Sequence, residues 1–325
     1  MNKFIFMIMC HKNPNQVIRL IDRCKNSNVD IVVHADINMS SQDYGILESY
    51  IRKKQGVFLT NKRLHGELDK RSLVDIVFEM LESAMKYSKQ NDVHYKYFAL
   101  LSGQDYLVKS IDWICEKLDE NYPKPFIDCT PYHKDNWLYK KFNFSPSFVK
   151  YNEWITKSFK KGFIRSSIRC SAVIYNFITC KILKKSVASY LIKNNVELFG
   201  GSAWWILPDI AIDYIYKNKD SKISSYILDN VRTPEENYFQ IMTMRSPIME
   251  LVQLNPYDMV EQNCKTWAYF SDEGKPFKGH PYIFTIQEAE KLENTDFWIA
   301  RKFDEKIDND IFDIIDEFIN KGYSK

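Results

Sequence analysis

Short apolar runs alternate with helical patterns along the first third of the chain. The apolar runs predict buried strands at residues 4–10, 30–33, 57–60 and 97–101. Helices are predicted between them at residues 14–24, 41–54 and 73–85. Strands that alternate with crossover helices predict an α/β fold, Rossmann-like, with a mostly parallel central sheet and helices on both faces.

Polar side chains follow several of these predicted strands. The first strand ends at His11, the second at His34 and Asp36, and the fourth at Ser102-Gly103-Gln104-Asp105. Because the carboxyl ends of parallel strands meet at one edge of the sheet, these residues are expected to line one ligand crevice, where an acid can accept hydrogen bonds from ribose hydroxyls. Taken singly, His34 or Asp36 equally fits a turn residue that caps the next element.

The length of the chain and the absence of a long linker favour one catalytic unit over residues 1–325. No long Pro/Gly/Ser linker interrupts the chain. Residues 1–110 are predicted as a nucleotide-binding half, and residues 111–325 as a less regular acceptor-binding and catalytic half that ends in an amphipathic helix at 312–319. Neither a Gly-x-Gly-x-x-Gly turn nor a Gly-Lys-Ser/Thr loop occurs, which disfavours dinucleotide dehydrogenases and ATPases of those kinds.

Composition adds two indications about ligands. Aromatic residues make up 15% of the chain, which suits flat, hydroxyl-rich ligands such as sugars, although an aromatic-rich core explains the same number. The net charge of +3 is too small to argue for nucleic acid, so that class of partner is disfavoured.

Cysteine usage and the start of the chain indicate a cytoplasmic protein. The seven cysteines are widely spaced and form no Cys-x-x-Cys pair, as expected of reduced, structural thiols. The apolar run at residues 4–10 is followed by a polar segment without a small-residue cleavage site, so it is predicted to be a strand and not an export signal.

Residues 151–185 are basic and rich in apolar side chains, with the single acid Glu153. Such a segment fits peripheral contact with the anionic inner face of the plasma membrane, or binding of a phosphorylated acceptor. It equally fits two ordinary helices with solvated faces. The sequence leaves these interpretations open.

Two charged motifs in the last third indicate transfer chemistry on an anionic donor. Thr233-Pro234-Glu235-Glu236 offers carboxylates, and Ala300-Arg301-Lys302-Phe303-Asp304 offers adjacent cations. Such a combination suits a reaction in which a base deprotonates one group while cations stabilise a leaving group. Each motif alone is also explained by the first turn of a helix or by a solvated face.

The chain resembles the core-2/I-branching enzymes, which include β-1,6-N-acetylglucosaminyltransferases and peptide O-xylosyltransferases. The resemblance covers most of the sequence and is carried by motifs in a fixed order: His11-Lys12-Asn13-Pro14, Val33-His34-Ala35-Asp36, Leu101-Ser102-Gly103-Gln104-Asp105-Tyr106, Gly201-Ser202-Ala203-Trp204-Trp205, Thr233-Pro234-Glu235-Glu236, His280-Pro281 and Ala300-Arg301-Lys302-Phe303-Asp304. It implies an inverting glycosyltransferase of the GT-A type that needs no divalent metal.

The sequence agrees with metal independence. Ser102-Gly103-Gln104-Asp105 stands where a metal-dependent enzyme of this fold would place Asp-x-Asp, and the acids at 308–310 are better explained as a helix cap. By resemblance, the cations that would stabilise the departing diphosphate are Lys302, Arg301 and Lys265. Lys109 is a further candidate for contact with phosphate or uracil, or else a plain surface lysine. No metal ligands and no cofactor are predicted, the UDP-sugar being a co-substrate.

The resemblance also assigns roles on the acceptor side. Glu236 corresponds to the catalytic base, whereas Glu235 is expected to orient its loop or bind an acceptor hydroxyl. Trp204 and Trp205 are expected to offer an apolar face to a sugar ring, although one of them is expected in the core. Donor contacts are expected from His11, His34, Asp36, Ser102, Gly103, Asp105 and Lys109.

Two positions depart from the family pattern. Residues 64–72 have His65-Gly66 where a Trp-Gly pair followed closely by Ser is expected, and Leu107 replaces the usual Pro. Because of the first departure, the family pattern does not predict donor contacts from that loop.

The sequence therefore predicts a bacterial-type enzyme that moves N-acetylglucosamine or xylose from a UDP-sugar to a hydroxyl of a glycan or lipid-linked glycan, in surface polysaccharide synthesis. The alternatives are a non-catalytic glycan- or nucleotide-sugar-binding protein on the same scaffold, and a hydrolase of phosphodiesters or sugar nucleotides.

Overall fold

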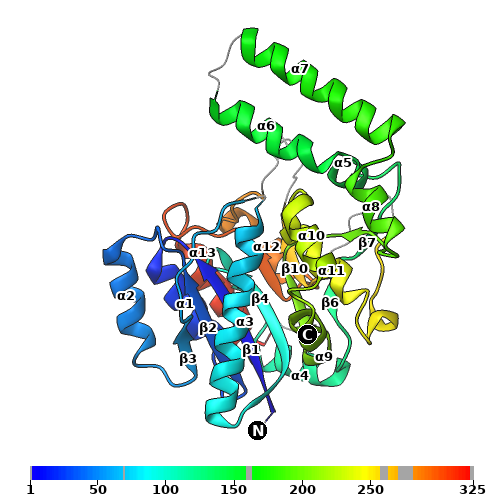
Figure 1. Ribbon diagram of the computed structural model, residues 1–325. Helices are drawn as coiled ribbons and strands as arrows, with labels where there is room; N and C mark the ends of the chain where they lie inside the picture. Colours follow the sequence, from blue (N-terminus) through cyan, green and yellow to red (C-terminus); the bar gives the residue numbers. More distant parts are fainter. Residues whose placement is uncertain (1, 69, 159–162, 257–262, 270–280, 323–325) are drawn as a thin grey trace.

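The first strand, β1 (Asn2–Cys10), lies at the centre of the molecule because both of its faces are apolar. Phe4, Phe6 and Ile8 pack into one buried cluster, and Ile5 and Met7 pack into another on the opposite face of the sheet. A strand that is covered on both sides needs such a continuous apolar run. The computed structural model describes residues 2–68, 70–158, 163–256, 263–269 and 281–322 (Figure 1).

The central sheet has six strands in the order β3-β2-β1-β4-β9-β6. The parallel part pairs β3 with β2, β2 with β1, and β1 with β4, whereas β9 runs antiparallel to β4 and β6. The sheet is therefore mixed and mostly parallel. Its other strands are β2 (Val29–Ala35), β3 (Val57–Leu59), β4 (His94–Ser102), β6 (Phe126–Ile127) and β9 (Trp205–Pro208).

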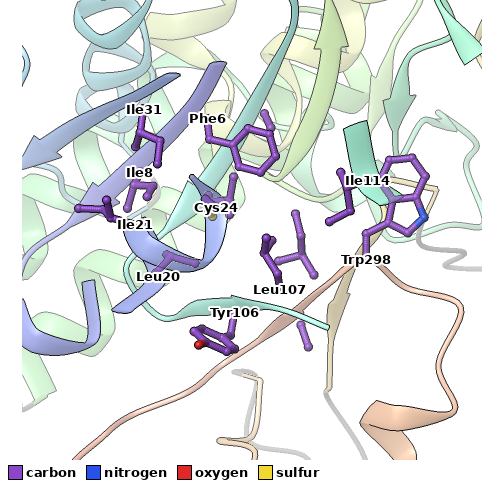
Figure 2. Close-up of a cluster of buried hydrophobic side chains, with 14 of the residues drawn as sticks. Phe6, Ile8, Leu20, Ile21, Cys24, Ile31, Tyr106, Leu107, Ile114 and Trp298 are labelled. Carbon is purple, nitrogen blue, oxygen red and sulfur yellow. The ribbon is translucent and has the colours of Figure 1, made fainter. Parts of the chain in front are cut away.

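Helices cover both faces of this sheet, which confirms the predicted α/β class. The cluster on one face, part of which is shown in Figure 2, includes side chains of α1 (Pro14–Cys24), α2 (Ser41–Ile51), α4 (Ile111–Asn121), α12 (Ala289–Glu293) and α13 (Asp310–Asn320). The cluster on the other face includes side chains of α3 (Arg71–Asn91), α5 (Leu138–Phe142), α8 (Val187–Lys193), α9 (Asp209–Lys217), α10 (Lys222–Asn230) and α11 (Tyr238–Thr243).

Two smaller sheets flank the central one. One joins β5 (Asp105–Leu107), β11 (Ile299–Arg301) and β10 (Thr266–Ala268), and the other joins β7 (Thr130–Pro131) and β8 (Phe199–Gly200). The first carries the C-terminal cationic motif to the loop after β4, because Arg301 pairs with Asp105 across the antiparallel strands.

The segment at 151–185 is helical at residues 151–158 and 163–182. α6 (Pro146–Ser158) and α7 (Phe163–Phe177) form a hairpin that projects from the body, and α7 continues into a π-helix, η1 (Ile178–Ile182) (Figure 1). Residues 159–162 of this segment, and His280 of the His280-Pro281 motif, lie outside the described residues.

Several predicted boundaries shift slightly. The helix predicted at 41–54 ends at Ile51, and the strands predicted at 30–33 and 97–101 extend to Val29–Ala35 and His94–Ser102. The acids at 308–310 do act at a helix start, since Asp308 Oδ1 accepts a hydrogen bond from the Ile311 N–H at 3.1 Å. Among the helices that are described, none is long and apolar enough to span a bilayer.

Candidate active site

A cavity of about 850 Å³ lies at the carboxyl ends of the central strands. Its lining combines residues that are far apart in sequence: His11 and Lys12 after β1, His34 and Asp36 at the end of β2, Ser102 and Gly103 at the end of β4, Trp204 before β9, Glu235 and Glu236 of the 3₁₀ turn η2 (Pro234–Glu236), and Arg301 and Lys302 at the end of β11. The acidic and the cationic motifs of the last third therefore share one cavity with the predicted strand-end residues.

Asp36 anchors one wall of the cavity. Its carboxylate accepts hydrogen bonds from the backbone N–H groups of Gly66 and Asn38, both at 2.8 Å, and lies 3.2 Å from His65 Nδ1. Burial by itself would raise the pKa of Asp36, but these N–H groups and the His65 ring outweigh it and lower the pKa. The loop that departs from the family pattern is thus tied to the cavity wall through Asp36.

His34 and His11 differ in their roles. His34 is buried, its Nε2 accepts a hydrogen bond from the Leu64 N–H at 3.0 Å, and burial lowers its pKa to about 4, so the ring is neutral and orders the neighbouring loop. His11 is exposed and lines the cavity, and partial desolvation and the charges of Lys12 and Lys302 lower its pKa. His11 is the better placed of the two to meet a ligand.

Arg301 is held by partners on two sides. Its guanidinium lies 3.9 Å from the ring centroid of Trp204, and Nη1 lies 3.5 Å from Asp105 Oδ1. Asp105 is fully buried and also accepts hydrogen bonds from the Ser102 N–H at 2.8 Å and the Ser102 hydroxyl at 3.1 Å. Burial raises the pKa of Asp105, which Arg301 opposes. Asp105 therefore positions Arg301 and Ser102 and does not line the cavity itself.

Lys302 is the cation with the fewest competing partners. Its ammonium makes no hydrogen bond or ion pair within the described part of the chain, whereas neighbouring Lys12 pairs with Asp304 at 2.6 Å. Burial, with the charge of Arg301, lowers the pKa of Lys302. Asp304 is further fixed by Asn13 Nδ2 at 2.9 Å, so Asn13, which begins α1, holds the cationic motif in place of capping its helix.

The carboxylates face the cavity from η2. Glu236 forms an ion pair with Lys141 of α5, and the same ammonium donates to Thr233 Oγ1 at 2.7 Å. Thr233 begins the turn with a left-handed backbone (φ 51°), and buried Asn237 donates from Nδ2 to the Thr233 carbonyl at 2.7 Å. The turn that presents Glu236 is thus fixed from both ends.

Some functional candidates escaped the sequence analysis. Asp128, which lies on the cavity wall directly after β6, is buried and accepts a hydrogen bond from the Cys264 N–H at 3.2 Å; burial raises its pKa to about 6. Trp137 lines the cavity, and Lys141 pairs with Glu236. The signal for Asp128 was present, since it is an acid at the end of a short apolar run.

Gly201 is required by a close approach of two backbones in the cavity wall. A Cβ atom at this position would lie 2.1 Å from the carbonyl oxygen of Asp128. We expect Gly201→Ala to destabilise the protein by about 1–3 kcal/mol, because the backbone must move to relieve the overlap. Urea denaturation would measure the change.

Gly45 provides the matched control, because a Cβ at this position in α2 meets nothing within 4 Å. Gly45→Ala is expected to raise the stability by about 0.5–1 kcal/mol, as is usual in a helix interior. Equal stability of Gly201→Ala and the unmodified protein would contradict the tight approach.

Some predicted site residues lie away from the cavity. Trp205 is fully buried against Phe239, with ring centroids 4.9 Å apart, so it belongs to the core and cannot stack on a sugar. Lys109 is buried, with a pKa lowered by that burial, and Lys265 Nζ lies 5.8 Å from the Trp298 ring centroid. Neither lysine is part of the cavity lining.

The arrangement suits acid–base chemistry next to an anionic leaving group. Over the ranges that the structure describes, no cluster of three or more His, Cys, Asp or Glu side chains has the geometry of a metal site. The charged groups that line the cavity are the cations Lys12, Arg301 and Lys302 and the acids Asp36, Asp128, Glu235 and Glu236.

Comparisons with known proteins connect this site to a family. None of the curated proteins that were compared matches the chain. Among solved structures, mouse xyloside xylosyltransferase 1 in its apo form is 8% identical, with 92% of this chain and 97% of that chain covered and a TM-score of 0.33. A 4-diphosphocytidyl-2C-methyl-D-erythritol synthase from Anaerococcus prevotii is 14% identical, with 41% of this chain and 57% of that chain covered and a TM-score of 0.24. At such low scores these likenesses carry no argument.

The family comparison is decisive. The model of the Core-2/I-branching enzymes matches residues 4–293, which include the residues at the ends of β1, β2 and β4 and the acidic motif, and end before Arg301 and Lys302. The chain therefore belongs to the Core-2/I-branching enzyme family and is a glycosyltransferase.

Proposed function

We propose that this enzyme transfers a sugar, N-acetylglucosamine or xylose, from a UDP-sugar to a hydroxyl of a glycan acceptor, with inversion and without a divalent metal. We further propose that the acceptor is a free or lipid-linked glycan in bacterial surface polysaccharide synthesis. The observation that carries the proposal is that Glu236 and Lys302 line the same cavity.

In the proposed reaction, Glu236 takes the proton of the acceptor hydroxyl. The acceptor oxygen attacks the anomeric carbon from the face opposite the nucleotide, a new C–O bond forms, and the bond between the anomeric carbon and the diphosphate oxygen breaks. The bonding electrons leave with UDP. A single displacement of this kind inverts the anomeric configuration.

Lys302 and Arg301 would stabilise the negative charge that develops on the diphosphate. Opposite charges about 4 Å apart at an effective dielectric constant near 20 interact by roughly 4 kcal/mol, and each 1.36 kcal/mol is about tenfold in rate. Fixed cations of this strength are sufficient to replace much of the contribution of a metal ion. Arg301 also lines the cavity, and its guanidinium is oriented there by Asp105, whose Oδ1 lies 3.5 Å from Arg301 Nη1.

On the donor side, we propose that His11, Asp36 and Ser102 contact the nucleotide sugar, since their side chains lie at the strand ends that form the cavity. Trp204 would contact the acceptor sugar with the part of its ring that Arg301 leaves uncovered. A cytoplasmic location fits the cysteines, all of which are free in the structure, because disulfides are rare in reducing compartments.

Transfer is expected to continue unchanged in excess EDTA, because the charge on the leaving group is met by fixed side chains. The test incubates the protein with a panel of UDP-sugars and glycan acceptors and follows UDP release and product mass, with EDTA or with added Mn²⁺. Strict dependence on Mn²⁺ would contradict the role of the cations. Donor binding without any product or UDP release would identify a binding protein instead, and release of free sugar that no acceptor suppresses would identify a hydrolase.

A further inference from the structure

We propose that the face of α7 and η1 that is turned away from α6 binds the surface of an anionic lipid bilayer. The proposal concerns where the protein docks and is independent of the reaction assigned to the cavity.

One face of α7 is already used to form the hairpin. The Tyr175 hydroxyl lies 3.2 Å from Ser147 Oγ of α6, Ala172 is buried, and Asn176 Oδ1 accepts a hydrogen bond from the Ser145 N–H at 2.8 Å. Ala172, Tyr175 and Asn176 are spaced by three and four residues along α7, so they lie on one side of the helix. This side packs against α6 and the chain just before it.

The opposite side of α7 and η1 is apolar and exposed. We call the side chains that form this side the α7 apolar face. They are Val173, Ile174 and Phe177, each 59% exposed, with Ile178, 42% exposed, and Ile182, 65% exposed. Their spacing places them in one stripe along the helix. Single exposed apolar residues need no explanation, but a continuous stripe of large ones marks an interaction surface.

The charge of the sequence that contains the α7 apolar face identifies the partner of that face. Between Glu153 and Glu197 the sequence contains no Asp or Glu, whereas it contains Lys157, Lys160, Lys161, Arg165, Arg169, Lys181, Lys184, Lys185 and Lys193. Lys184 and Lys185 are exposed directly after η1. An apolar stripe flanked by cations is the pattern of helices that lie in the interface of anionic membranes, where basic residues are attracted to the lipid headgroups.

A second copy of this chain fits the same surface poorly. Pairing two α7 apolar faces would bring the flanking lysines of both copies together without any acid from this segment to compensate them. An anionic bilayer complements both the apolar stripe and the cations. We therefore commit to the bilayer as the partner.

The position of the hairpin relates the docking surface to the cavity. In Figure 1 the hairpin projects beyond the ends of the central strands that are opposite the N-terminus, which are the carboxyl ends of the parallel strands. At its foot, Lys181 Nζ donates to the Tyr139 hydroxyl of α5 at 2.6 Å, and Lys141 of the same helix pairs with Glu236. Docking through α7 would hold the cavity side of the enzyme near the membrane surface.

Vesicle flotation with the full-length protein tests the proposal. The protein is expected to float with vesicles of phosphatidylcholine and phosphatidylglycerol, and to float much less with vesicles of phosphatidylcholine alone or at high salt. The double variant Ile174→Asp, Phe177→Asp is expected to lose about tenfold or more of the binding, because it places acids in the stripe. Lys184→Glu, Lys185→Glu should weaken binding to the anionic vesicles only.

The matched control is Met249→Asp, Leu251→Asp. Both of its side chains are 44% exposed on η3 (Met249–Leu251), which is not part of the hairpin, and flotation should be unchanged. A thermal unfolding curve confirms that each variant folds. The proposal is overturned if the unmodified protein fails to float with anionic vesicles, if the α7 variant floats equally well, or if the protein is a dimer that the α7 variant dissociates. No donor or acceptor is needed, so this outcome is independent of the transfer assay.

Discussion

Glu236→Gln is expected to abolish sugar transfer while donor binding stays intact. The amide cannot accept the proton of the acceptor hydroxyl, and loss of a general base typically lowers the rate by about 10²–10⁴-fold. The substitution keeps the size of the side chain in η2, so the cavity should keep its shape. The comparison is between the turnover at saturating donor and acceptor and the rise in melting temperature that the UDP-sugar causes.

Glu235→Gln is the matched control for this experiment. It changes the neighbouring acid of the same turn, which also lines the cavity. Because we expect Glu235 to bind the acceptor or orient the loop, its loss should raise the acceptor KM more than it lowers kcat. Full activity of Glu236→Gln, or an equally deep loss of kcat in Glu235→Gln, would remove Glu236 from the role of base.

The parts of the fold that sequence predicts well are the long, fully covered strands. β1 has large apolar side chains on both faces, so its position in the centre of a parallel sheet follows from its composition alone. The antiparallel strand β9 was not predicted, although Trp205–Pro208 lies between β4 and β6. Four residues show too little periodicity to distinguish a strand from an apolar turn.

The residues of the candidate site that could be predicted from the sequence are those at the ends of parallel strands. His11, Asp36 and Ser102 come together because parallel strands bring their carboxyl ends to one edge. Asp128 follows a strand of only two residues, and Lys141 reaches Glu236 from α5, a contact that no local pattern encodes.

The tryptophan pair shows what a linear motif leaves undetermined. Trp204 and Trp205 are adjacent in sequence, but Trp204 lines the cavity under Arg301, whereas Trp205 is buried in the core. Successive side chains at a strand point to opposite faces, so only one of the pair can meet a ligand. The sequence indicates that the two residues differ, and the structure shows which of them is at the cavity.

Lys302→Ala is expected to lower turnover by about 10²–10³-fold, because a cation that interacts with the leaving diphosphate by roughly 4 kcal/mol is lost. Lys302 should matter more than Arg301 for charge, since Arg301 is paired with Asp105, whereas Lys302 takes part in no ion pair within the described residues. Lys306→Ala is the matched control, because Lys306 is an exposed lysine of the following loop and should leave turnover unchanged. A loss below about twofold in Lys302→Ala would place this lysine outside the reaction.

The pH dependence of transfer gives an independent test of the same cation. Burial and the neighbouring charge of Arg301 lower the pKa of Lys302, so its ammonium loses the proton at a lower pH than an ordinary lysine does. If the charge acts on the leaving group, turnover must fall as the pH rises through this lowered pKa. In Lys302→Arg the guanidinium stays protonated over that range, so the alkaline fall should move to higher pH while much of the turnover is retained. An alkaline limb that is identical in Lys302→Arg and the unmodified enzyme would mean that another group titrates, and that the charge of Lys302 does not act on the departing UDP.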